Sequence, residues 1–200
     1  FVVALLNDLF GIQARGGCSC AGPYGHRLLG IDLDTSHEFE SEIVRGCEGI
    51  KPGWVRVNFN YFISEDVFEY ILDAVEFVAE HGWKLLPDYH FEPDTGRWYH
   101  RERRLEAPHS LHDVTYEGGQ LEHPGERMTA PASDLPGYLE EARRIVERAP
   151  ERYDSLDLGA LEVRDDFEQL RWFPLPYEAL AEIQGNPTAD TGRMPIKLAG

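Results

Sequence analysis

The chain has 200 residues, of which 42% are hydrophobic, and it carries a formal net charge of −17 at pH 7. A charge this negative argues against nucleic acid or an anionic membrane surface as a partner. No run approaches the roughly 20 apolar residues that a membrane-spanning helix needs. Three cysteines without the spacing of a secreted disulfide framework predict a reducing, cytoplasmic setting.

The first residues follow a helical pattern, with apolar side chains at Val2, Leu5, Leu6 and Leu9. Gly11 predicts the end of this helix. Because no capping residue precedes it, we interpret the chain as the C-terminal part of a longer protein. Downstream we expect a short strand over residues 12–15, a helical segment over 24–29 and a helix over 36–45. Its apolar side is expected to consist of Phe39, Ile43 and Val44.

Residues 54–61 alternate between apolar and polar side chains, which predicts a strand. Its core face would consist of Val55, Val57, Phe59 and Tyr61. Arg56 would then lie on the opposite, polar face. A helix is expected next, capped by Ser64 and ending near His81. Its predicted apolar face comprises Val67, Phe68, Ile71, Leu72, Val75 and Val78.

The second half of the sequence is more polar and less periodic. Residues 89–91 and 97–100 flank a turn sequence and predict a hairpin. Residues 101–133 are expected to form an extended surface connection. A helix is predicted over 135–149, where the apolar residues are Leu135, Leu139, Ala142, Ile145, Val146 and Ala149. The tail from residue 185 carries no strong signal.

Two of the three cysteines lie in a glycine-bounded loop, Arg15-Gly16-Gly17-Cys18-Ser19-Cys20-Ala21-Gly22-Pro23. The glycines allow a sharp turn, and Pro23 fits the first turn of a following helix. A thiol near a helix N-terminus and beside Arg15 would have a lowered pKa, which favours the reactive thiolate. The alternative is that these cysteines are small buried hydrophobic residues.

This loop, the strand that carries Arg56 and the long helix after it resemble one family over residues 1–83. The order is similar to the C-terminal small domain of class V aminotransferase-fold enzymes, which are fold type I and use pyridoxal 5′-phosphate (PLP). The nearest likeness is to cysteine desulfurases and selenocysteine lyases. The resemblance implies an α/β chain, with an α+β small domain over residues 1–100. Residues 101–200 would form an acidic, partly irregular C-terminal extension with at least one helix.

The resemblance also implies roles for three residues. Cys20 falls where desulfurases keep the nucleophile that accepts sulfur from the substrate. Arg56 falls where the family binds the α-carboxylate of its amino-acid substrate, and Arg15 would support the same pocket. Family members are commonly homodimers, so a homodimer is the expectation for the complete protein.

Two features depart from the family pattern. Cys18 and Ser19 replace a His-His pair, so the surroundings of Cys20 differ. The lysine that holds PLP lies in the family's N-terminal large domain, and Lys51, Lys84 and Lys197 do not match its context. By itself this chain is therefore expected to be inactive.

Three other interpretations stay open. The complete protein could catalyse another PLP reaction on an amino acid, such as transamination, epimerisation or elimination. Cys18, Cys20, His26 and Cys47 could in principle bind zinc, although their spacing is not a common structural-zinc pattern and no metal site is predicted. The extension could instead be a non-catalytic interaction module.

Overall fold

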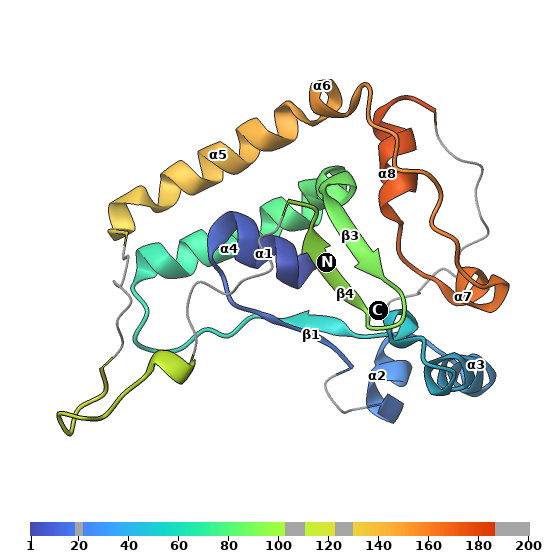
Figure 1. The fold of residues 1–200 in the computed structure, drawn as a ribbon, viewed down its shortest axis with the longest axis horizontal. Helices are drawn as coiled ribbons and strands as arrows, with labels where there is room; N and C mark the ends of the chain where they lie inside the picture. Colours follow the sequence, from blue (N-terminus) through green and yellow to red (C-terminus); the bar gives the residue numbers. More distant parts are fainter. Residues whose placement is uncertain (19–21, 103–110, 123–129, 187–200) are drawn as a thin grey trace.

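The computed structural model describes residues 1–18, 22–102, 111–122 and 130–186. Within these ranges the chain forms eight α-helices and two small antiparallel sheets of two strands each (Figure 1). The mixture of helices with small sheets confirms the predicted α/β class. Among the described residues, no helix combines the length and the apolar character needed to cross a lipid bilayer.

The first helix, α1 (Val2–Phe10), confirms the prediction and ends at Gly11, whose φ is 65°. The strand that follows, β1 (Arg15–Gly17), begins three residues later than predicted. Ile12 belongs instead to the helix end, because its N–H donates to the Leu6 carbonyl at 3.1 Å. That bond and the one from the Gly11 N–H to the Asn7 carbonyl close the last turn of the helix, and Ile12 is buried.

Two helices follow, α2 (Gly22–Leu28) and α3 (Leu33–Val44). Pro23 lies in the first turn of α2, as predicted. Helix α3 begins earlier than expected because Asp32 caps it, accepting a hydrogen bond from the Thr35 N–H at 2.8 Å. Val44 is 81% exposed, so its placement on the buried side was wrong. A short 3₁₀ turn, η1 (Glu48–Ile50), then leads to the second strand.

That strand, β2 (Trp54–Arg56), is much shorter than the predicted 54–61. Its partner β1 has only three residues, so the backbone beyond Arg56 has no ladder to join. The predicted core face is wrong at three of its four residues, because Val55 is 37% exposed, Phe59 44% and Tyr61 95%. Val57 alone of the later residues packs against the core.

The longest helix, α4 (Glu65–His81), is capped as predicted, with the Val67 N–H donating to Ser64 Oγ. Its fully buried residues are Tyr70, Ala74, Phe77 and Val78. Only Val78 of these was in the predicted apolar face, and the predicted Leu72 is exposed. The buried stripe is shifted because aromatic Tyr70 and Phe77 pack edge-on against Phe10 of α1.

A 3₁₀ segment, η2 (Gly82–Asp88), connects α4 to the predicted hairpin, β3 (Tyr89–Glu92) and β4 (Arg97–His100). Tyr89 and Phe91 alternate on the buried face of β3. Phe91 stacks on Trp98 of β4 with ring centroids 4.6 Å apart. The hairpin is confirmed.

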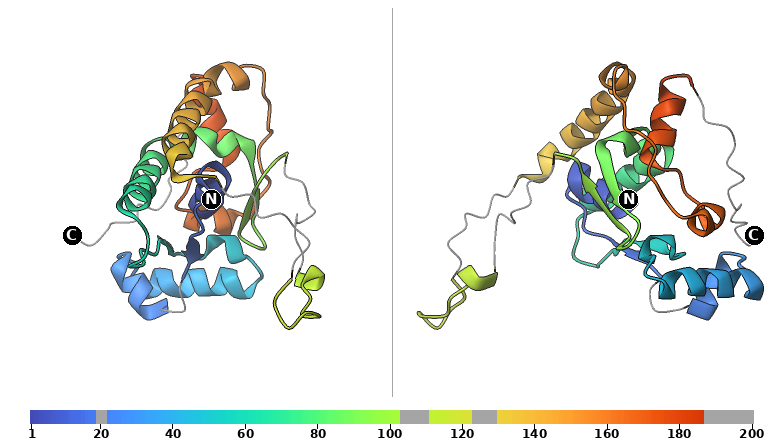
Figure 2. Two further views of the ribbon diagram at one scale, coloured as in Figure 1. Left: turned by 90° about the vertical axis from the view of Figure 1, so that its left-hand side faces the viewer. Right: turned by 45° about the vertical axis from the view of Figure 1, so that its right-hand side comes forward.

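The second half of the chain is more helical than its sequence pattern predicts. Helix α5 (Leu135–Glu147) confirms the expected helix. Three further helices had no sequence signal that we recognised: α6 (Ala149–Tyr153), α7 (Asp165–Leu170) and α8 (Pro176–Ile183). Short 3₁₀ turns occur at η3 (Leu111–Asp113) and η4 (Ala132–Asp134). Helix α5 lies along α1 and α4, and α8 lies beside η2 and β3 (Figure 2).

These helices share hydrophobic cores with the first hundred residues. One core joins α1, α4 and β3 to Leu139, Ala142 and Val146 of α5. A second joins Phe39, Ile50 and Phe91 to Phe167, Leu170 and Leu175. Residues 1–100 and 101–200, which the sequence resemblance separates, therefore share hydrophobic cores.

A buried ion pair fixes α7 to α8. The Arg171 side chain is fully buried, and its two terminal nitrogens donate to the two oxygens of Glu178, each at 2.8 Å. Glu178 Oε2 also accepts a hydrogen bond from the Leu175 N–H at 2.7 Å. Arg171 further pairs with Glu168. A buried charge is tolerated only when its partners satisfy it, and this guanidinium is satisfied on all sides.

Removing one member of this pair is predicted to destabilise the protein strongly. We expect Arg171→Ala or Glu178→Ala to lower the free energy of unfolding by about 3–5 kcal/mol, because each removes one partner of a buried, doubly hydrogen-bonded ion pair. The control is Arg144→Ala, since the Arg144–Glu141 pair is exposed and should contribute less than about 1 kcal/mol. Urea unfolding monitored by circular dichroism measures both. Equal losses for the buried and the exposed pair would contradict this account.

Candidate functional site

The candidate site is the ribbon formed by β1 and β2, which places two predicted site residues directly opposite each other. In its antiparallel register Arg15 faces Arg56, Gly16 faces Val55 and Gly17 faces Trp54. Opposite residues in an antiparallel pair project from the same face, so both guanidinium groups leave one side of the ribbon. Both side chains are exposed. The structure thus brings together the two arginines that the resemblance assigned to one pocket.

Two glycines allow the strands to approach this closely. Gly17 has a φ of 118°, a conformation that residues with a side chain rarely adopt. A Cβ placed on Gly53 would lie 2.4 Å from both the carbonyl carbon and oxygen of Gly17. The backbone at Gly17 therefore occupies the space that any side chain at Gly53 would need.

The two faces of the ribbon have different neighbours. Gly16 lies against Val3 of α1, since a Cβ on Gly16 would be 3.1 Å from that side chain. Trp54 shares the arginine face because residues two apart on a strand point the same way. Its ring lies so close to Gly25 that a Cβ there would be 2.9 Å from it. Helix α2 therefore borders the arginine pair.

The electrostatics of the pair favour an anionic ligand. Within the described ranges neither Arg15 nor Arg56 forms an ion pair, whereas Arg45, Arg144, Arg152, Arg164 and Arg171 do. Like charges directly opposite on paired strands destabilise a sheet. A carboxylate between them would remove that repulsion and accept hydrogen bonds from both guanidinium groups.

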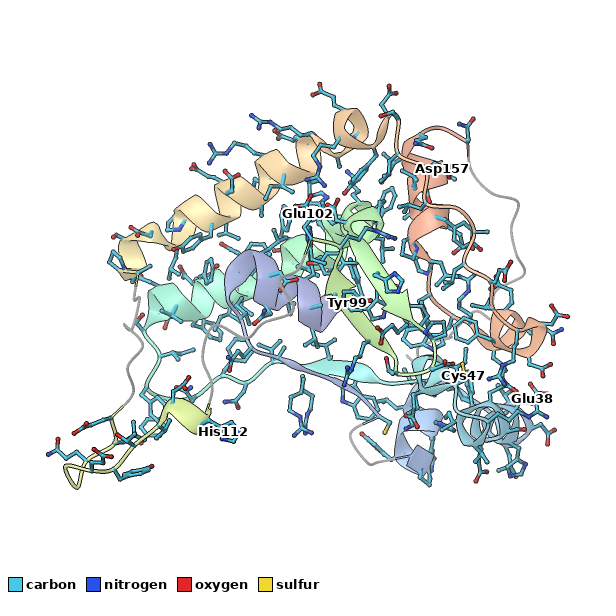
Figure 3. The ribbon with its side chains drawn as sticks, in the orientation of Figure 1. Glu38, Cys47, Tyr99, Glu102, His112 and Asp157 are labelled. Atoms are coloured by element: carbon cyan, nitrogen blue, oxygen red, sulfur yellow. The ribbon has the colours of Figure 1, made fainter. Side chains whose placement is uncertain are left out.

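The cysteines occupy different environments. Cys20, the predicted nucleophile, lies outside the described residues. Cys18 directly follows β1 and is partly exposed. Cys47 is 2% exposed and lies beside the hairpin loop, where its Sγ is 3.7 Å from the Pro93 carbonyl oxygen (Figure 3). Burial raises the pKa of the Cys47 thiol, so this side chain is a core residue rather than a nucleophile.

Two of the four residues considered for zinc have other partners. His26 Nδ1 is 2.7 Å from Ser36 Oγ, a contact that joins α2 to α3. Cys47 belongs to the second hydrophobic core. In the part of the chain that the structure describes, no three His, Cys, Asp or Glu side chains form a group that could hold a metal ion.

The described residues do not form a PLP-binding site by themselves. A Schiff-base lysine needs an amine that can lose its proton, typically through desolvation or a neighbouring cation. Lys51 is instead paired with Glu48, and Lys84 Nζ lies 5.9 Å from the ring centroid of Trp83. Lys197 is outside the described residues. The arginine pair suits a substrate carboxylate, but nothing beside it in the described chain suits the cofactor.

Sequence reasoning missed a set of partly buried polar contacts beside the hairpin. Asp88 Oδ2 accepts a hydrogen bond from the Tyr153 hydroxyl at 2.6 Å and pairs with Arg152. The Tyr89 hydroxyl donates to Asp8 at 2.9 Å. Burial raises the pKa values of both tyrosines, so they remain neutral donors. The residues that form these contacts lie 64 or more positions apart in the sequence, so no local pattern could have revealed them.

Comparison with known proteins adds no relative. No protein-family model matches the chain, and searches of curated proteins and of solved structures find no match.

The close approach of Gly17 and Gly53 predicts the effect of adding one methyl group. We expect Gly53→Ala to lower the free energy of unfolding by about 1–3 kcal/mol, because the β1 backbone must move to admit the Cβ. Gly137→Ala in α5 is the control, since a Cβ there meets nothing within 4 Å. That substitution should stabilise the helix by up to about 1 kcal/mol. Equal changes in the free energy of unfolding of the two variants, measured by urea titration, would contradict the close approach of the Gly17 and Gly53 backbones.

The cysteine environments predict selective alkylation. At pH 8 we expect iodoacetamide to modify Cys18 in the folded chain at least about tenfold faster than Cys47, whose thiol is buried and has a raised pKa. Peptide mapping by mass spectrometry after timed labelling measures both rates. In denaturing urea the two rates should converge. Comparable rates in the folded protein would show that Cys47 is accessible.

Proposed function

We propose that this chain supplies the substrate-carboxylate site of a PLP-dependent enzyme of the class V aminotransferase fold that acts on an amino acid. The observation that carries the proposal is the pairing of Arg15 with Arg56 across the ribbon. The sequence resemblance independently implies that these two positions share one pocket. Their exposure leaves both guanidinium groups available to a ligand.

The pair is suited to one end of an amino acid. Each planar guanidinium offers parallel N–H donors that match the two oxygens of a carboxylate, which a lysine cannot do. Two arginines from facing strands would fix the carboxylate in one orientation. The amino group of the same substrate would then project away from the ribbon, toward whatever group reacts with it.

The cofactor would be held outside this chain. PLP acts as an electron sink for carbanions formed at the α-carbon of an amino acid. We propose that a large domain N-terminal to this chain provides its lysine, in a cytoplasmic enzyme that is a homodimer. The role proposed for the described residues is confined to binding and orienting the substrate.

The nature of the reaction depends on Cys20. Carboxylate binding is common to all amino-acid substrates, so the arginine pair supports transamination, epimerisation or elimination as well as desulfuration. A cysteine five positions after Arg15 in the sequence favours the desulfurase. There Cys20 would accept the sulfur atom of a cysteine substrate.

The binding role can be tested on the 200-residue chain. We expect L-alanine to shift the Nε–Hε resonances of Arg15 and Arg56 in ¹⁵N NMR spectra. Arg15→Gln or Arg56→Gln should weaken binding about tenfold or more, because each removes a charge-assisted hydrogen bond. Arg97→Gln is the control, as an exposed strand arginine in the other ribbon. If all three variants bind alike, the pair is not the carboxylate site.

The catalytic role needs the full-length protein with PLP. With L-cysteine as substrate and dithiothreitol to reduce the enzyme persulfide to sulfide, we expect Cys20→Ser to abolish sulfide release while leaving the PLP absorbance spectrum intact. Arg56→Ala should raise KM and lower kcat/KM by about tenfold or more. Unchanged turnover and KM in Arg56→Ala would refute its role. A full-length protein that binds no PLP would favour the non-catalytic interaction module.

A further inference from the structure

A second candidate binding site lies at the C-terminal end of α4, away from the arginine ribbon. Side chains from α4, η2, α5, α6 and α8 line a groove of about 430 Å³. In the view of Figure 1, α6 and α8 lie in the upper part of the molecule and α2 and α3 in the lower part. A volume of this size lies within the range of small-molecule sites, roughly 300–1,000 Å³.

The wall of the groove is apolar and aromatic. Phe77 of α4, Val146 of α5 and Ile183 of α8 line it together with Trp83. Trp83 is only partly buried, so part of its ring is available to a ligand. Burying a flat apolar group against these side chains would contribute the hydrophobic part of a binding free energy.

Two cations line the same groove. Lys84 is partly buried, and its Nζ lies near the Trp83 ring rather than near a carboxylate. Arg143 forms no ion pair among the described residues, whereas its neighbour Arg144 pairs with Glu141 at 3.0 Å. The other titratable groups in the lining are His81, which lies 3.6 Å from Glu80, and Glu147. In a chain of net charge −17, an apolar groove with two such cations favours an anionic ligand.

We propose that this groove binds a small amphipathic anion, an aromatic or branched apolar body that carries a carboxylate. The body would lie against Trp83, Phe77 and Val146, and the carboxylate would accept hydrogen bonds from Lys84 and Arg143. The groove joins α4 and η2 to three helices from the second half of the chain. A ligand there would therefore stabilise the association of the two halves by mass action.

The test uses 1-naphthoate as the probe and 1-naphthalenemethanol as its uncharged counterpart. Since a carboxylate could also bind the arginine ribbon, the titration is made in the 200-residue chain carrying Arg15→Gln and Arg56→Gln. Because the arginine ribbon is disabled in this background, naphthoate binding reports on the groove alone, and its absence would say nothing about the proposed function. Isothermal titration calorimetry gives the affinity, and the thermal unfolding midpoint gives a second readout.

We expect naphthoate to bind at least about tenfold more tightly than the alcohol, and to raise the unfolding midpoint. Lys84→Gln and Arg143→Gln should each weaken naphthoate binding about tenfold and leave binding of the alcohol unchanged. Arg144→Gln is the matched control on the same helix and should bind like the parent. Equal affinities for the acid and the alcohol, equal effects of Arg143→Gln and Arg144→Gln, or no binding up to about 10 mM would each overturn the proposal.

Discussion

The alternation of side chains along β3 is the constraint on which the rest of the fold depends. Tyr89 and Phe91 project from the same buried face, yet Tyr89 belongs to the core around α1, α4 and α5, and Phe91 to the core around α3 and α7. Trp98 on β4 packs against both. A sheet of two strands is marginal in isolation, so the hairpin and the two cores stabilise one another. The helices of the second half complete both cores, which makes them structural components of the fold.

Sequence patterns predicted the elements whose signals are local. Helix α5 and the hairpin follow their periodicity and turn residues, and Ser64 caps α4 as expected. The sequence-based predictions fail where tertiary contacts determine the length or the burial of an element. The residues after Arg56 alternate between apolar and polar side chains as in a strand, but no neighbouring strand pairs with them, and Tyr61 is exposed. Helix α7 is short, and its position depends on Arg171, whose buried pairing with Glu178 no local pattern reveals.

The candidate site was only partly predictable for the same reason. Alternation placed Arg56 on a polar face, and the family resemblance connected it to Arg15, but only the register shows that the two residues are directly opposite. The groove at Lys84 and Arg143 had no sequence signal, because its walls come from five separate elements. Both sites share one electrostatic feature. In a strongly acidic chain, each site offers two cations, Arg15 with Arg56 and Lys84 with Arg143, and a ligand there could supply the anion.

The most direct test of the central claim is a double-mutant cycle between Arg15 and Arg56. The free energy of unfolding is measured by urea titration for the parent, Arg15→Gln, Arg56→Gln and the double variant. One series is in sodium chloride and the other in sodium acetate at equal ionic strength, so that general screening is the same. The account predicts an unfavourable coupling of about 0.2–1 kcal/mol in chloride, from two like charges on facing strands, and a favourable coupling in acetate. A coupling that is zero in both salts, or the same in both, would contradict a carboxylate site at this pair.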